Sequence, residues 1–349
     1  IDHVMIEYMK LEEFSKELLD KLWAAMKKSR RLLEVYVLKE EHRKFEELVD
    51  QIRGKKIDRL LETDGALDKQ VLKVFSSLSN CSQMIVKGGI DRGVAEKVHD
   101  SAKFTVANLV DSDTAVATLS RMVTHDPTLY DHSATVAMLG AMIATKCLPK
   151  DVSVQEAEMV AQCGLYHDVG KTCVPSAVLH KPGRFTPEEF EVMKGHTTMG
   201  EEELNRVIEH GCPIDPIAAR VACEHHEKFE GHGYPYGRKG RLEEEENGIH
   251  LYSRITTIAD VYSALLMKRV YKPAYEPQDA IKIMAETAHK DYDPLIFNNF
   301  LKQVVSSLNH YQKRKKKNKE KGRILYFDKN GFLKEQVYDH NAGKKKESA

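Results

Sequence analysis

The sequence lacks the cysteine pattern of a disulfide scaffold or a zinc ribbon. Its six cysteines are spread along the chain, and no two of them form a C-x-x-C pair. Both classes of protein depend on closely and regularly spaced cysteines. We therefore expect reduced thiols, mostly packed in the interior, and a cytosolic compartment.

Long apolar runs and a net charge are missing as well. No stretch approaches the roughly 20 apolar residues that a helix needs to cross a bilayer, and the first residues show no signal-peptide pattern. The 53 Lys and Arg residues balance the 53 Asp and Glu residues. A chain with no net charge has no overall electrostatic attraction to DNA, RNA or an anionic membrane. We expect neither a nucleic-acid partner nor a membrane span.

What is present is a long chain in which the helical period dominates. Its 349 residues, 42% of them hydrophobic and 30% charged, suffice for two or three globular domains. The pattern predicts a mostly helical accessory or regulatory module over 1–122, a helical catalytic domain over 123–312, and a basic linker, β-hairpin and disordered tail over 313–349. Near-heptad spacing over 4–33 predicts a long helix, which either packs on the next domain or forms a homodimer or a partner contact.

The element most indicative of chemistry is the segment His167-Asp168-Val169-Gly170-Lys171. A capping box at Ser153 and Glu156 opens a helix that runs to this segment and stops at Gly170, so the His-Asp pair is expected at a helix end. Adjacent imidazole and carboxylate groups offer a divalent metal two donors at once. Alone, such a pair is more often structural than functional.

Further histidines and one aspartate raise the weight of this pair. A helix start at Thr186-Pro187 leads to His196. The histidine doublet His225-His226 closes a helix that begins near Pro216. Asp260 falls within an apolar helical run, and the loop at 230–235 is rich in glycine. The candidate ligands outside the pair are His132, His196, His225, His226 and Asp260.

Three stretches together resemble the HD-GYP family of bacterial metal-dependent phosphodiesterases, in the HD superfamily. They are the segment 167–171, His225-His226-Glu227 and Gly233-Tyr234-Pro235. The similarity extends from about His132 to Val305 and predicts an all-α HD-domain helical bundle in a bacterial cytoplasmic protein. HD-type phosphohydrolases of mononucleotides or alarmones share the His-Asp pair but lack the other two stretches.

The resemblance implies a role for individual residues. It implies metal ligation by His167, Asp168, His196, His225, His226 and Asp260, with Asp168 bridging two ions. Lys171 is implied as a catalytic and phosphate-contacting cation, and Arg269, Lys272 and Tyr234 as further substrate contacts. Members with three metals place a glutamate at the position of Thr128. We therefore expect two metals, with His132 as a supporting or weak ligand.

Imidazole and carboxylate donors together suit iron, manganese or zinc better than magnesium or calcium. Two such ions activate a bridging water and stabilise both oxygens of an in-line displacement at phosphorus, so no protein nucleophile is required. Iron or manganese is the expected cofactor. The resemblance implies hydrolysis of cyclic di-GMP to linear pGpG, GMP or both, by a metal-bridging hydroxide. The alternatives are another cyclic dinucleotide, such as cyclic GMP-AMP, or a weakly active nucleotide-binding signalling module.

Overall fold

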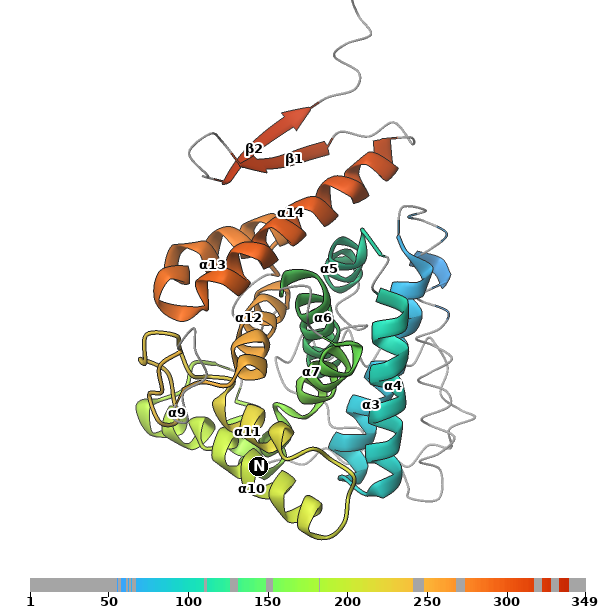
Figure 1. Ribbon diagram of the computed structural model, residues 1–349. Coiled ribbons are helices and arrows are strands. Elements are labelled where there is room, and N and C mark those ends of the chain that lie inside the picture. The colour runs from blue at the N-terminus through green and yellow to red at the C-terminus, as the bar shows by residue number, and fades with distance from the viewer. Residues whose placement is uncertain are drawn as a thin grey trace, which may run out of the picture. The chain divides into compact units, whose positions relative to one another are not determined.

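The computed structural model describes residues 67–338 except 110–111, 126–130, 149–152, 182, 241–247, 268–273, 317–321 and 328–332, with a few single residues between 55 and 64. The predicted helix over 4–33 therefore lies outside the described residues. The described elements are helices in all but one place (Figure 1). The helices are α3 (Lys69–Gly88), α4 (Arg92–Leu109), α5 (Ala115–His125), α6 (His132–Cys147), α7 (Val154–Tyr166), η3 (Val169–Cys173), α8 (Ser176–Leu179), α9 (Pro187–Lys194), α10 (His196–Glu209), α11 (Ile217–Glu224), α12 (Leu251–Leu266), α13 (Pro277–Asp291) and α14 (Pro294–Lys316).

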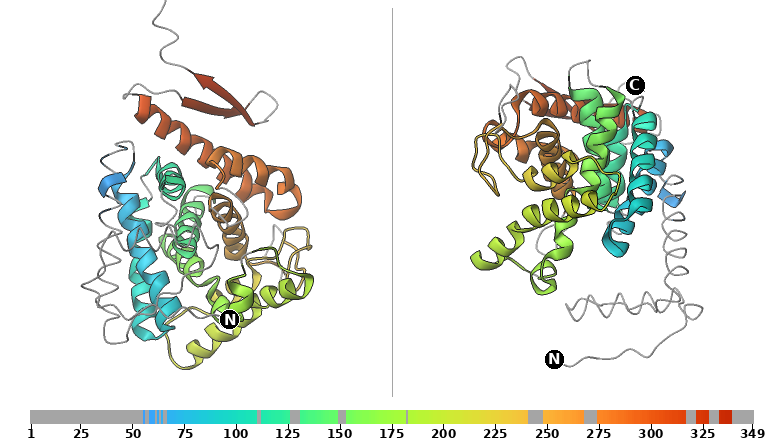
Figure 2. Two further views of the ribbon diagram at one scale, coloured as in Figure 1. Left: turned by 180° about the vertical axis from the view of Figure 1, so that it is seen from behind. Right: turned by 60° about the horizontal axis from the view of Figure 1, so that its bottom comes forward.

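The all-α bundle predicted from the sequence is confirmed. α6 and α7 lie at its centre, with α3 and α4 on one side and α12 on the other, an arrangement that both views from the front and from behind show (Figures 1 and 2). α6 is buried along most of its length, in keeping with its small and apolar sequence. A Cβ on Gly164 would lie 2.5 Å from the Cα of Ala137, so glycine is what lets α7 approach α6 so closely.

Two strands follow the bundle. β1 (Gly322–Phe327) pairs antiparallel with β2 (Leu333–Tyr338), and the register runs from Gly322 opposite Tyr338 to Phe327 opposite Leu333. They occupy the region in which the sequence predicts a hairpin. The residues that join them lie outside the described part of the chain, so the turn itself stays a prediction.

The domain boundaries expected from the sequence stay a prediction, and the compact units of the chain give a division of another kind. The division falls between Thr63 and Asp64, whereas the sequence predicts a boundary between 122 and 123. The difference arises because α3 and α4 bury their apolar faces against α6 and α7 and share their core. Burial against a neighbour is not visible in the periodicity of a single helix.

One predicted helix is divided in two. Periodicity predicts a single helix from Arg92 to Met122, but α4 ends at Leu109 and α5 begins at Ala115. Between them, Ser112 donates to the Asp68 carboxylate at 2.7 Å, and Thr114 accepts from Arg314 at 3.1 Å. Short polar side chains with such partners stabilise a turn in place of the helix.

Candidate metal centre

Local sequence signals place the His-Asp pair where it was predicted. The capping box of Ser153 and Glu156 starts α7, and the helix ends at Tyr166, with His167 as its C-cap. Asp168 then leads into η3. A Cβ on Gly170 would lie 2.0 Å from the carbonyl oxygen of His196, so glycine at this position lets η3 pack directly against the start of α10.

Three histidines are oriented by backbone carbonyls close to them in the chain. The Nδ1 atoms of His167, His196 and His225 lie 2.8, 2.6 and 2.8 Å from the carbonyl oxygens three residues earlier in the chain. A carbonyl oxygen only accepts, so each Nδ1 carries the proton and donates. In the neutral rings the Nε2 lone pairs are therefore free to bind a cation.

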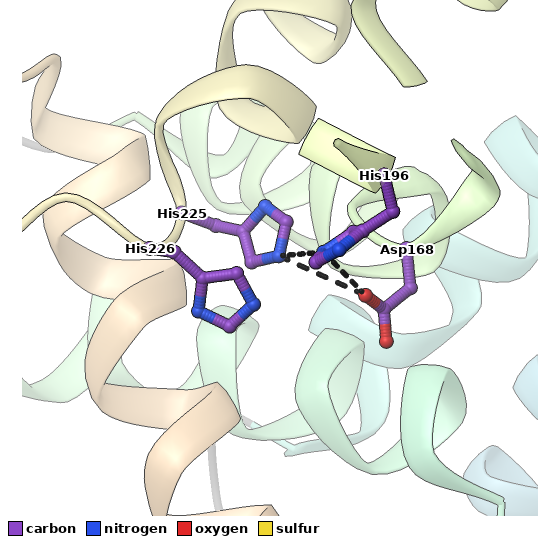
Figure 3. A group of neighbouring side chains, drawn as sticks. All are labelled: Asp168, His196, His225 and His226. Atoms are coloured by element: carbon purple, nitrogen blue, oxygen red, sulfur yellow. Dashed lines mark hydrogen bonds and ion pairs between the residues drawn. The ribbon is translucent and has the colours of Figure 1, made fainter. Parts of the chain in front are cut away.

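These nitrogens converge with carboxylate oxygens in two groups. The four-residue group is Asp168, His196, His225 and His226, and the three-residue group is His132, His167 and Asp260. Within each group the potential ligand atoms all lie within 4.8 Å of one another. Figure 3 shows the three rings and the carboxylate of the four-residue group turned toward a common point. The structure thus brings together all seven residues that the sequence singles out as candidate ligands.

Asp168 stands between the two groups. Its Oδ1 lies 3.4 Å from His196 Nε2 and 3.7 Å from His225 Nε2. Its Oδ2 faces the other group, 3.3 Å from His167 Nε2 and 3.5 Å from His132 Nε2. One carboxylate therefore presents one oxygen to each group, which is the arrangement of a bridging ligand.

Asp260 on α12 also reaches both groups. Its Oδ1 lies 3.0 Å from His132 Nε2, and its Oδ2 lies 3.7 Å from His226 Nδ1. His132, expected as a supporting or weak ligand, is placed within the three-residue group itself. Its Nδ1 lies 3.0 Å from the hydroxyl of Ser263, one turn beyond Asp260.

Burial and charge set the protonation of these groups. Burial lowers the pKa of His225 well below its usual range and that of His226 to about 3, so both rings are neutral near pH 7. Burial also acts to lower the pKa of His167, but the Asp168 carboxylate outweighs it and raises that pKa. Burial opposes the charge on Asp168, yet His167 and Lys171 outweigh it and hold the Asp168 pKa well below its usual range.

The donor set fits a divalent metal. The Nε2 of His167 and the Oδ1 of Asp168 are buried without a hydrogen-bond partner. The Nε2 atoms of His196 and His225 lie 3.3 Å apart, and two unprotonated nitrogens repel at that distance unless a cation lies between them. Mixed nitrogen and oxygen donors are typical of iron, manganese or zinc sites.

The predicted substrate contacts are described only in part. The Lys171 ammonium lies 2.5 Å from Asp168 Oδ2 and is 35% exposed. The Tyr234 ring lies 4.8 Å from that of His226, with 32° between the ring planes. Burial raises the pKa of the Tyr234 hydroxyl, which stays a neutral phenol. Arg269, Lys272 and Thr128 lie outside the described residues.

The glycine-rich loop is folded against the histidine doublet. The buried Glu227 carboxylate accepts hydrogen bonds from the backbone N–H groups of Tyr236 and Arg238, at 2.7 and 3.0 Å. A Cβ on Gly233 would lie 2.5 Å from the carbonyl oxygen of His226, so the loop backbone crosses the doublet in close contact. These contacts hold Tyr234 beside the candidate ligands.

Sequence reasoning missed Glu224, which is 1% exposed. Its carboxylate accepts from Arg220 at 2.9 Å, Arg238 at 2.5 Å and the Ser253 hydroxyl at 2.9 Å. It also accepts from the backbone N–H of His250 at 2.9 Å, at the start of α12. The sequence signal that could have identified Glu224 is its position directly before the His225-His226 doublet, on a helix that is otherwise largely apolar. Through it the helix that carries His225 is tied to the helix that carries Asp260.

Comparison with known proteins places this geometry in context. Residues 117–296 match the HD domain family. A cyclic di-GMP phosphodiesterase of Thermotoga maritima is 34% identical over 190 residues, which are 54% of this chain and 48% of that protein. A 3′3′-cGAMP-specific phosphodiesterase of Vibrio cholerae is 39% identical over 132 residues, 38% of this chain and 24% of that protein. The chain spans about half the length of the curated relatives it matches.

A solved structure has the same fold. The HDG"Y"P protein Bd1817 of Bdellovibrio bacteriovorus aligns with a TM-score of 0.52 and 16% identity, over 76% of this chain and 80% of that one. Among the described residues, no helix is both long and apolar enough to span a membrane.

Proposed function

The chain belongs to the HD-GYP family of HD-domain proteins. On that premise we propose that it is a metal-dependent phosphodiesterase. Its reaction in this proposal is the hydrolysis of cyclic di-GMP to linear pGpG, GMP or both. The observation that carries the proposal is the position of Asp168, which presents one carboxylate oxygen to each of two groups of potential ligands. A carboxylate shared by two cations suits phosphodiester hydrolysis by a pair of metals.

The cofactors in this proposal are two divalent cations, iron or manganese. His132, His167 and Asp260 would hold one of them, His196, His225 and His226 the other, and Asp168 both. When bound, they supply Lewis acidity that makes water nucleophilic near neutral pH and stabilises charge on the phosphate.

The remaining polar groups act on the substrate. Lys171 is paired with Asp168 in this structure, and cations bound to the same carboxylate repel its ammonium. With metals bound there, the ammonium would be available to the phosphate and would stabilise the charge that develops on its oxygens. Tyr234, beside His226, contacts the nucleotide, and Arg269 and Lys272 are proposed to do so as well.

A second candidate substrate is 3′3′-cGAMP. Three relatives from Vibrio cholerae, 33–39% identical over the matched residues, carry that specificity in their names. The two dinucleotides differ in one base, so the metal centre serves either one equally well.

We also propose a bacterial cytoplasmic location and a regulatory role for 1–122, through a homodimer or a signalling partner. All six cysteines are free thiols, and four of them are buried, which is typical of a reducing compartment.

The test is a hydrolysis assay after anaerobic purification. Protein loaded with iron or manganese is given cyclic di-GMP or 3′3′-cGAMP, and the linear products are separated by chromatography. We expect turnover of at least one dinucleotide, lost on chelation and restored by metal. If metal-replete protein hydrolyses neither dinucleotide, the proposal is contradicted. Binding of a dinucleotide without turnover favours a nucleotide-binding signalling module.

A further inference from the structure

A series of aromatic rings leads away from the candidate metal ligands. The Tyr234 ring lies against His226, and the Phe190 ring meets Tyr234 edge to face, with centroids 6.4 Å apart at 79°. Phe190 belongs to α9, the short helix before His196. The rings therefore join the metal centre to the surface of the molecule.

The Phe190 side chain does not act as a core residue. It is 45% exposed, and none of the residues of α9, all of which the structure describes, is buried. An aromatic ring contributes to folding mainly through the area that it buries. A half-exposed ring in contact with a tyrosine beside the metal centre offers that face to a ligand.

Lys194, at the end of α9, adds a cation to the two rings. Its Nζ lies 5.4 Å from the centroid of Phe190 and 5.8 Å from that of Tyr234, within the range of cation–π attraction. The same ammonium lies 2.6 Å from the exposed Glu191 carboxylate. The result is a positive charge held over the two aromatic rings.

We propose that Phe190, Tyr234 and Lys194 form a purine subsite of the metal centre, in which Phe190 stacks on a base, the Tyr234 ring borders that base edge to face, and Lys194 donates to its acceptor edge. The subsite rests on the proposed function, because a base is joined to its phosphate through one ribose and therefore lies beside the metal ligands. Stacking tolerates every base. The lysine distinguishes between bases, because guanine presents two acceptors, O6 and N7, where adenine presents one acceptor and an amino donor.

The positive charge of Lys194 accordingly selects guanine, and the aromatic rings of the subsite hold the base. Phe190 sets affinity and Lys194 sets the preference for guanine over adenine. Neither residue is a candidate metal ligand, so both are open to substitution without loss of the metals.

Phe190→Ala, Phe190→Tyr and Lys194→Met test the subsite, with Phe185→Ala as the matched control. Phe185 is a second exposed phenylalanine, located just before α9. For Phe190→Ala we expect a rise in KM for cyclic di-GMP of about 5- to 100-fold, with a smaller change in kcat. Phe190→Tyr restores the wild-type KM, and Phe185→Ala leaves it unchanged.

For Lys194→Met the quantity measured is the ratio of kcat/KM for cyclic di-GMP to that for cyclic di-AMP. We expect this ratio to fall by about tenfold. Metal content per chain, measured for every variant, stays at the wild-type value, which separates a base contact from damage to the metal centre.

The outcomes distinguish this proposal from the one it rests on. If the wild type hydrolyses cyclic dinucleotides and Phe190→Ala behaves like Phe185→Ala, the subsite is wrong and the phosphodiesterase stands. An unchanged ratio for Lys194→Met removes the lysine from base selection. If metal-replete wild type neither binds nor hydrolyses any cyclic dinucleotide, both proposals fall together.

Discussion

The two groups of candidate ligands are assembled in different ways. In the four-residue group, His196 and His225 are each oriented by a carbonyl oxygen three residues earlier in the chain. In the three-residue group, His132 is oriented by Ser263, 131 residues away. The first group draws on residues between 168 and 226, and the second on residues of α6, the end of α7 and α12. Part of the site is therefore built by local geometry and part by the packing of the bundle.

The largest effect is expected where the two groups meet. Asp168→Ala removes the oxygen atoms that face both groups, so we expect loss of both metals and a fall in kcat of at least on the order of 1,000-fold. Metal analysis and the hydrolysis assay measure the two losses. A variant that retains two ions per chain and full turnover would falsify the bridging role.

Glu224→Ala is expected to affect the connection between the groups. It removes a buried carboxylate that accepts four hydrogen bonds, two of which, from the His250 N–H and the Ser253 hydroxyl, tie α11 to α12. We expect a loss of about 3 kcal/mol in the free energy of unfolding. Denaturant unfolding measures it.

The control for Glu224→Ala is Glu203→Ala. Glu203 pairs with an Arg206 side chain that is 60% exposed, so its loss costs no more than about 1 kcal/mol. Equal losses in the two variants would show that Glu224 does not tie the helices together.

His132→Ala is expected to affect one group more than the other. The substitution removes a nitrogen from the three-residue group and leaves the local bonds of His196 and His225 intact. We expect metal affinity in that group to fall about 10- to 100-fold, with one ion per chain retained at limiting metal. Titration with manganese measures both quantities. Loss of both ions together would show that the two groups bind metal as one unit.

Ser263→Ala is expected to give the smallest effect. The histidine remains, but its Nδ1 loses the hydroxyl partner on α12, and we expect a loss of metal affinity of about tenfold or less, confined to the three-residue group. Ser306→Ala, next to His310 on α14, is the control for a serine paired with a histidine outside the site. An effect of Ser263→Ala equal to that of the control would leave His132 oriented by packing alone.

Much of the fold could be read from helix signals in the sequence. The capping box at Ser153 and the helix start at Thr186 lie where they were predicted, and the helix ends at His167 and His225 follow. These signals act between residues a few positions apart. The break between α4 and α5 depends on partners far away in sequence, and was missed for that reason. The core that α3, α4, α6 and α7 share depends on such partners as well.

The sequence by itself determined the chemistry of the donors and the orientation of three imidazole rings, because a residue's identity and an i−3 hydrogen bond are local properties. It also supplies glycine at Gly164 and Gly170, where a Cβ would clash with the backbone of another helix. Only the tertiary structure decided that His132 and Asp260 meet 3.0 Å apart, that Asp168 faces both groups, and that Glu224 ties two ligand helices together. These relations join segments far apart in the chain, and burial of the shared core is what brings them within contact distance.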